Sequence, residues 1–153
     1  MNTRPAIVDL AVGSDLIGDS LLEELLESLK EGIQVIDLRA HVVRGEGYAP
    51  IARAVASFIR DGKARRGLLV CGTGIGVSIA ANRITGVRAA ICHDPYSMQR
   101  SILSNNCQVA CFGSRVIAPK NALILFHNWL QLTYDPHTDY AIKLAEIDNL
   151  EMP

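Results

Sequence analysis

A cysteine followed by closely spaced glycines is the part of the sequence whose residue types could do chemistry. Cys71 follows the apolar stretch 67–70, and Gly72, Gly74 and Gly76 come after it at alternate positions. This spacing predicts a buried strand that turns directly into a helix, with the thiol beside the first amides of that helix. A helix N-terminus favours negative charge, so a thiolate is available there as a base or a nucleophile. Cys71 is therefore a candidate catalytic residue.

The glycine turn itself predicts an anion site, because glycines let the backbone approach a ligand and the first helix amides point outward unpaired. Two well-known phosphate loops fit less well. The loop of nucleotide hydrolases needs a lysine before Ser or Thr, where this chain has Val77-Ser78, and the dinucleotide loop needs a glycine at position 77. A tight turn without a ligand is the remaining alternative, but it does not account for the cysteine at the end of the strand.

The other cysteines and histidines carry weaker signals. Without a signal segment we expect free thiols, and Cys92, Cys107 and Cys111 are interpreted as small buried hydrophobes. Cys107 and Cys111 lie four apart in a strand-like run and face the same way, but zinc would need further Cys or His ligands. No metal site is therefore expected. His93 either caps the helix that follows it or belongs to the site, whereas His127 is interpreted as structural.

The elements that must position these residues follow from the alternation of short apolar runs with stretches of helical period. This is the pattern of a parallel sheet covered by helices on both faces. Strands are expected at 6–12, 34–38, 67–70, 87–91 and 107–112, and helices at 21–29, 51–59, 75–82, from Pro119 onward and at about 140–150. We predict an α/β fold with three layers, α/β/α, around a five-stranded parallel Rossmann-like sheet, as a single domain over residues 1–153. Ligands of such sheets bind beyond the carboxyl ends of the strands.

Composition and charge limit the function classes. The chain has 153 residues, 49% of them hydrophobic, and a net charge of −1, as in ordinary globular proteins. Arg60, Lys63, Arg65 and Arg66 cluster in what is interpreted as a polar turn, so no nucleic-acid partner is expected. No apolar stretch reaches the roughly 18 residues that span a bilayer. We therefore expect a cytoplasmic protein without a membrane partner.

Beyond these general features, one long string is specific. Residues 71–83 read Cys-Gly-Thr-Gly-Ile-Gly-Val-Ser-Ile-Ala-Ala-Asn-Arg, and this string resembles the signature of the type B ribose-5-phosphate isomerases and their galactose-6-phosphate isomerase relatives. The resemblance runs from about residue 6 to residue 129. Further matching segments are Gly13-Ser-Asp15, Gly86-Val-Arg-Ala-Ala, His93-Asp-Pro-Tyr-Ser97, Asn105, and Phe112-Gly-Ser-Arg115-Val.

The resemblance implies an aldose–ketose isomerase that moves a proton in a sugar phosphate through an enediolate, with no cofactor. The Cys71 thiolate would take the proton, and the turn amides would hold the developing negative oxygen. Asp15 and Thr73, also assigned to catalysis, would help ring opening and bind hydroxyls. Asn82 would support the loop or bind a hydroxyl. The substrate-binding candidates are Gly72, Gly74, Ile75, Gly76, Asn82, Asn105, Arg115, Tyr48 and His137.

The chain departs from the family pattern where the family has basic residues. Leu16 and Ser104 stand where the family has histidines, and residues 135–140 keep His137 without the arginines that grip the substrate phosphate. Phosphate binding would then fall to Arg115, with support from Arg100 or His137.

These departures bear on the assembly. The family is dimeric, with residues of both subunits in each site, so we expect a homodimer or homotetramer. The alternative is a pair with a complementary family subunit that supplies the missing residues. A sugar-phosphate-binding relative without turnover is the rival interpretation, and the retained Cys71 argues against it because binding alone gains nothing from a reactive thiol.

Overall fold

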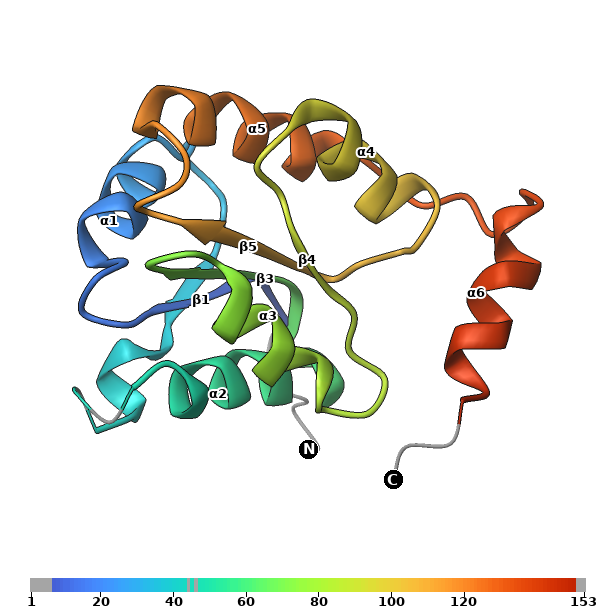
Figure 1. Cartoon of the computed structure of the whole chain (residues 1–153), viewed down its shortest axis with the longest axis horizontal. Helices are drawn as coiled ribbons and strands as arrows, with labels where there is room; N and C mark the ends of the chain where they lie inside the picture. Colours follow the sequence, from blue (N-terminus) through green and yellow to red (C-terminus); the bar gives the residue numbers. More distant parts are fainter. Residues whose placement is uncertain (1–6, 44, 46, 151–153) are drawn as a thin grey trace.

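A five-stranded parallel sheet lies between two helical layers in the computed structural model, which describes residues 7–43, 45 and 47–150 (Figure 1). The strand order is β2-β1-β3-β5-β4, and every neighbouring pair is parallel. The strands are β1 (Val8–Ser14), β2 (Val35–Asp37), β3 (Ala64–Cys71), β4 (Ala89–Ile91) and β5 (Val109–Gly113). The predicted three-layer fold and five-stranded parallel sheet are confirmed.

The helices cover both faces of the sheet because each presents an apolar stripe to it. On one face lie α1 (Asp19–Glu27), α4 (Pro95–Leu103) and α5 (Pro119–Gln131), and on the other α2 (Ala49–Arg60) and α3 (Ile75–Asn82) (Figure 1). Two apolar clusters result, one around Trp129 and Phe112 and the other around Ile51 and Val77. A short 3-10 helix, η1 (Leu38–His41), follows β2. The last helix, α6 (Tyr140–Asp148), stands apart from these layers (Figure 1).

The start of helix α4 shows whether His93 caps this helix, one of the two roles predicted for it. The Asp94 carboxylate accepts a hydrogen bond from Ser97 N–H at 2.8 Å, and Pro95 follows at the first helical position, where its missing N–H costs nothing. Asp94 is therefore the cap, and His93 is not.

Some strand limits differ from those predicted. β3 begins three residues earlier than predicted because it pairs with β1 from Val8↔Ala64 onward, so Arg65 and Arg66 belong to a strand and not to a polar turn. β5 begins at Val109, so the prediction that Cys107 lies in this strand with Cys111 was wrong. Residue 6, where the first strand was predicted to begin, lies outside the described residues.

Arg66 has a structural task at the end of α5. Its guanidinium donates hydrogen bonds to the carbonyls of Trp129, at 2.5 Å, and of Leu132, and it lies 4.8 Å from the centre of the Trp129 ring. Trp129 lies in the last turn of α5 and Leu132 is its C-cap, where helix carbonyls lack the amides of a following turn; the Trp129 carbonyl also accepts from Leu132 N–H at 3.2 Å. The cation therefore satisfies a helix terminus.

No helix built from the described residues is long and apolar enough to cross a membrane.

Candidate functional site

The site is built where the strand order reverses, between β1 and β3. From β1 the chain moves to β2 on one side and then crosses to β3 on the other, which opens a crevice at the carboxyl ends of these strands. Ser14 pairs with Val70, and Asp15 N–H donates to the Val70 carbonyl at 3.2 Å. Asp15 and Cys71 therefore leave neighbouring strands at the same edge of the sheet.

The Cys71 thiol is held inside the turn that joins β3 to α3, residues 71–76. Its Sγ accepts a hydrogen bond from Gly74 N–H at 3.1 Å, and the residue is only 3% exposed. Gly74 has φ 78°, a left-handed conformation that suits glycine and that folds the amide back onto the sulfur. An N–H donor and a helix N-terminus both stabilise negative charge on sulfur. The arrangement suits a thiolate base.

The 71–76 turn rests directly on the end of β5, backbone against backbone. Ser114 N–H donates to the Cys71 carbonyl at 2.8 Å, and Arg115 N–H donates to the Gly72 carbonyl at 3.0 Å. A Cβ at Gly113 would lie 2.4 Å from the Thr73 carbonyl carbon, so only glycine allows this approach. These contacts between the end of β5 and the turn involve backbone atoms alone.

Arg115 and Tyr48 reach the same turn from other elements. The Arg115 Cδ would lie 3.8 Å from a Cβ at Gly72, which places its exposed side chain beside the turn. The Tyr48 ring covers Gly76, where an added Cβ would meet its Cε2 and Cζ at 2.5 Å. Thr73 contributes its hydroxyl oxygen, which accepts from Ile75 N–H at 3.3 Å. Predicted residues from three segments of the chain thus meet at one edge of the sheet.

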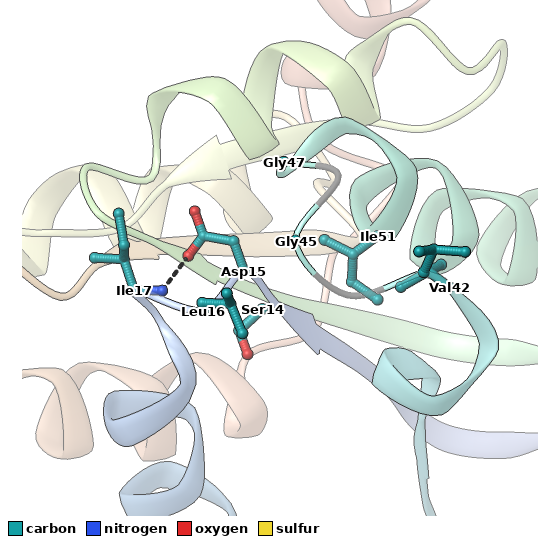
Figure 2. A pocket seen from close by; sticks show the side chains of 9 residues that line it. Ser14, Asp15, Leu16, Ile17, Val42, Gly45, Gly47 and Ile51 are labelled. Carbon is teal, nitrogen blue, oxygen red and sulfur yellow. Dashed lines mark hydrogen bonds between the residues drawn. The ribbon is translucent and has the colours of Figure 1, made fainter.

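Asp15 lines a cavity of about 210 Å³ next to this turn (Figure 2). Its Oδ1 accepts from Ile17 N–H at 3.0 Å and from Gly18 N–H at 2.9 Å, and Figure 2 shows its other carboxylate oxygen pointing away from those amides. Leu16, which is 63% exposed, also lines the cavity. The carboxylate is fixed in place with one oxygen available to a ligand.

The other predicted substrate-binding residues lie at the opposite, amino edge of the sheet. Asn82 ends α3 and is bonded to the first residue of β4, from its Nδ2 to the Ala89 carbonyl and from Ala89 N–H to its Oδ1, both at 2.9 Å. These bonds occupy the Asn82 amide, which supports the loop, as one of its two predicted roles requires. Asn105 precedes β5, a strand of five residues, so roughly 15 Å separates it from the thiol edge.

A second cavity, of about 450 Å³, collects the residues of the amino edge. Asn82, Asn105 and Arg100 line it together with Ile147 of α6. Arg100 Nε is buried there without a hydrogen-bond partner in the described part of the chain. His137 precedes α6 by three residues, and it lines a separate cavity together with Tyr140. One chain therefore does not bring His137 or Asn105 to Cys71.

The remaining cysteines are unsuited to the chemistry of Cys71. Burial raises the pKa of Cys92 to about 12 and that of Cys107 to about 11, and it also raises the pKa of Cys111. All three are buried free thiols, as predicted. Among the described residues no group of three or more His, Cys, Asp or Glu side chains could hold a metal ion.

Sequence reasoning left the role of His93 open and missed its main contact. His93 Nε2 accepts a hydrogen bond from Gly113 N–H at 2.8 Å. The two residues are twenty apart in sequence, and nothing in the local pattern around His93 indicates this partner. Only the register of β4 beside β5 brings them together.

A doubly wound parallel sheet with a thiol and an amide turn at its switch point defines a Rossmann-like α/β protein, and proteins of this class bind their ligands at that edge. The comparisons with known proteins narrow this class. A family model described as Ribose/Galactose Isomerase matches residues 10–147. The chain therefore belongs to the ribose/galactose isomerase family, and it is a sugar-phosphate isomerase of the aldose–ketose type.

Individual relatives are also named as sugar-phosphate isomerases. D-erythrulose-4-phosphate isomerase 2 of Mycolicibacterium smegmatis is 41% identical over 142 residues, which cover 90% of this chain and 93% of that protein. Ribose-5-phosphate isomerase B of Escherichia coli is 39% identical over 82% of this chain and 85% of its own. The structure of Clostridium thermocellum ribose-5-phosphate isomerase B superposes with a TM-score of 0.85 at 32% identity, covering 92% of this chain and 95% of that one.

Proposed function

We propose that Cys71 is the base of this isomerase and that its substrate is a four-carbon sugar phosphate. The observation that carries the first part is the hydrogen bond from Gly74 N–H to Cys71 Sγ at 3.1 Å, within a turn fixed on the end of β5. A thiolate stabilised in this way can remove a proton from a carbon next to a carbonyl group.

The proton transfer balances within the site. The thiolate takes a proton from the carbon beside the carbonyl, and the electron pair left behind forms the enediolate, whose oxygen becomes negative. The 71–76 turn amides hold that oxygen before and after the transfer, without reorganisation. The hydroxyl proton on the first carbon passes to the negative oxygen of the second, and the thiol returns its proton to the second carbon. The first carbon is then the aldehyde of an aldose, and the thiolate is restored. Asp15 and Thr73 bind substrate hydroxyls beside the turn.

Three observations support a short substrate. The M. smegmatis relative named for D-erythrulose 4-phosphate is 41% identical over 90% of this chain. Arg115 lies immediately beside the turn, so a phosphate held there stays near the reacting carbons. A four-carbon sugar phosphate also cannot close a five-membered ring, because its O4 carries the phosphate. No ring-opening group is then needed, which is compatible with the apolar Leu16 next to Asp15.

The experiment is an assay of the purified chain against erythrulose 4-phosphate, ribulose 5-phosphate and a ketohexose 6-phosphate. We expect the highest kcat/KM on the four-carbon substrate. Cys71→Ser should lower kcat at least about a thousandfold, because a hydroxyl is a much poorer base than a thiolate. Cys107→Ser, the same change at a buried thiol distant from the turn, should keep its activity. Undiminished turnover in Cys71→Ser would place the base elsewhere, and a preference for the five-carbon substrate would refute the four-carbon assignment.

We further propose that a complete site needs a second copy of the chain. The support is geometric, since Asp15, Cys71 and Arg115 lie at one edge of the sheet while Asn105 and His137 lie elsewhere. In a closed two-fold dimer the same surface patch of both copies meets itself, so a residue of one copy can lie against a different residue of the other and supply what that copy lacks.

Mixing two damaged variants tests this assembly. Cys71→Ser and His137→Ala should each be impaired as homodimers, while subunit exchange between them should restore about a quarter of the wild-type rate, because half of the dimers then hold one intact site. No recovery after verified exchange would mean that the residues act in one chain. If the wild-type chain alone turns over none of the three sugar phosphates and becomes active only with a second family member, the complementary-subunit assembly is the correct one.

A further inference from the structure

The amide of Gly113 is satisfied in an unusual way. The β4–β5 ladder ends with Ile91 opposite Cys111, and Gly113 lies two residues further on, beyond the end of β4. Its buried N–H would face no strand there. Instead it donates to Nε2 of His93, two residues past Ile91, at 2.8 Å. The imidazole takes the place of a strand carbonyl and extends the ladder by one bond.

The identity of the donor fixes the protonation state of the ring. A backbone N–H can only donate, so Nε2 must carry a lone pair and the ring proton must be on Nδ1. A protonated imidazolium would put an N–H against the Gly113 N–H and break this bond. His93 therefore holds Gly113 only as a neutral ring.

Gly113 is also the residue on which the 71–76 turn rests. Its backbone approaches Thr73 so closely that a Cβ would lie 2.4 Å from the Thr73 carbonyl carbon. The next two amides, of Ser114 and Arg115, donate to the carbonyls of Cys71 and Gly72 at 2.8 and 3.0 Å. A shift of Gly113 toward β4 would therefore carry these contacts, and the turn, with it.

We propose that His93 is a positioning residue for the isomerisation, which acts as a neutral hydrogen-bond acceptor that holds the end of β5 in place beneath the Cys71 turn. The proposal rests on the proposed role of Cys71 as the base. His93 does not touch the reacting atoms. Its effect reaches them through the backbone of Gly113, and reaction rate depends steeply on such placement, since a misplacement of about 1 Å can cost on the order of 100-fold.

The surroundings favour the neutral ring. Burial lowers the pKa of His93 from its ordinary value of 6.5, and the adjacent Asp94 carboxylate partly offsets this effect. On the β5 side the ring faces Phe112, at 6.3 Å between ring centres. The packed elements also carry Cys71 in the turn, Cys111 in β5, Arg115 after β5, and Tyr96 and Arg100 in α4, but Asp94 is the charged group that acts on the pKa of the ring. As pH falls through the lowered pKa, the acceptor is lost, so activity should fall on the acid side.

Two substitutions separate the acceptor from the bulk of the side chain. His93→Gln can place its Oε1 near the position of Nε2 and accept from Gly113 N–H, whereas His93→Leu fills similar space and cannot accept. We expect His93→Leu to lower kcat by about 10- to 100-fold with a much smaller change in KM, and His93→Gln to recover most of the loss. Thermal denaturation of both variants checks that they are folded.

The pH profile gives a readout that a merely structural role would not move. Protonation of His93 in the wild-type chain should remove the acceptor, as His93→Leu does, so kcat/KM should show an extra decline of about 10- to 100-fold below the lowered pKa of His93. His93→Gln has no such titrating ring, so the ratio of its kcat/KM to that of wild type should rise by about this factor as pH falls. A ratio that stays constant with pH, or a His93→Leu variant as active as wild type, would overturn the proposal. If Cys71→Ser keeps full activity, it is the proposed base that fails, so the two failures can be told apart.

Discussion

The 71–76 turn carries most of the predicted site residues, whereas helix α6 follows the predicted residue His137, and the turn and the helix are held in very different ways. The turn is fixed by backbone hydrogen bonds of 2.8 and 3.0 Å from β5 and by a glycine contact that admits no side chain. Helix α6 buries only Leu144 of its nine residues. Its described contacts to the body include the Arg88–Asp148 ion pair at 2.7 Å and the Arg100 guanidinium 5.9 Å from the Tyr140 ring.

This difference matches the proposed roles of the two regions, a rigid base in the turn and a docking segment in α6. A base must stay within a fraction of an ångström of its working position, and buried backbone contacts provide that rigidity. A segment that serves a second copy must be exposed before the two copies meet. On α6 the side chain of Ile142 is 70% exposed and that of Ile147 is 46% exposed. Large apolar side chains left uncovered on one helix are typical of a surface that contacts another protein. The comparison therefore agrees with a site completed by another chain.

Hydrogen exchange should show the largest contrast between the two regions. Amides of β3 and β5 should exchange only by global unfolding, while those of α6 should exchange by local opening in a monomeric variant. We expect the opening free energies to differ by about 5 kcal/mol. Equal protection in both regions, measured by mass spectrometry, would contradict the comparison. Protection of α6 that appears only in the dimer would sharpen it.

The substitution Gly113→Ala tests whether the turn is fixed by backbone approach. The new Cβ would lie 2.4 Å from the Thr73 carbonyl carbon, so strand or turn must shift, at a cost of about 3 kcal/mol of unfolding free energy. Gly72→Ala is the matched control, because its Cβ would have an ordinary contact of 3.5 Å with Ile17. Urea denaturation should place the control within about 1 kcal/mol of wild type. A tolerated Gly113→Ala would mean that the contact is not rigid.

The substitution Asp148→Ala should have the smallest effect. The Asp148 carboxylate is 50% exposed, so water and salt screen its ion pair with Arg88. We expect the unfolding free energy of the chain to fall by less than about 1 kcal/mol, and the difference to shrink further in high salt. A loss as large as that of Gly113→Ala, measured in the same denaturation series, would show that α6 is integral to the fold.

Much of the architecture could be predicted because its signals are local. The apolar run before Cys71 and the glycines after it predict the strand, the turn and the start of α3 at Ile75, all of which the structure has. The limits of β3 were less accessible. Whether Arg65 and Arg66 continue a strand depends on the presence of β1 alongside, and Arg66 is accommodated only because the α5 terminus and Trp129 receive its guanidinium.

The sequence by itself determined the parallel α/β class, the thiol at the end of a strand and the glycine turn into a helix, because each depends on residues adjacent in the chain. The tertiary structure alone decided which of the predicted residues meet. Strand order brings Asp15, Cys71 and Arg115 to one edge and sends Asn105 to the other. The register of β4 on β5 pairs His93 with Gly113. Such pairings join residues far apart in sequence, and local patterns do not encode them because they arise only when the sheet assembles.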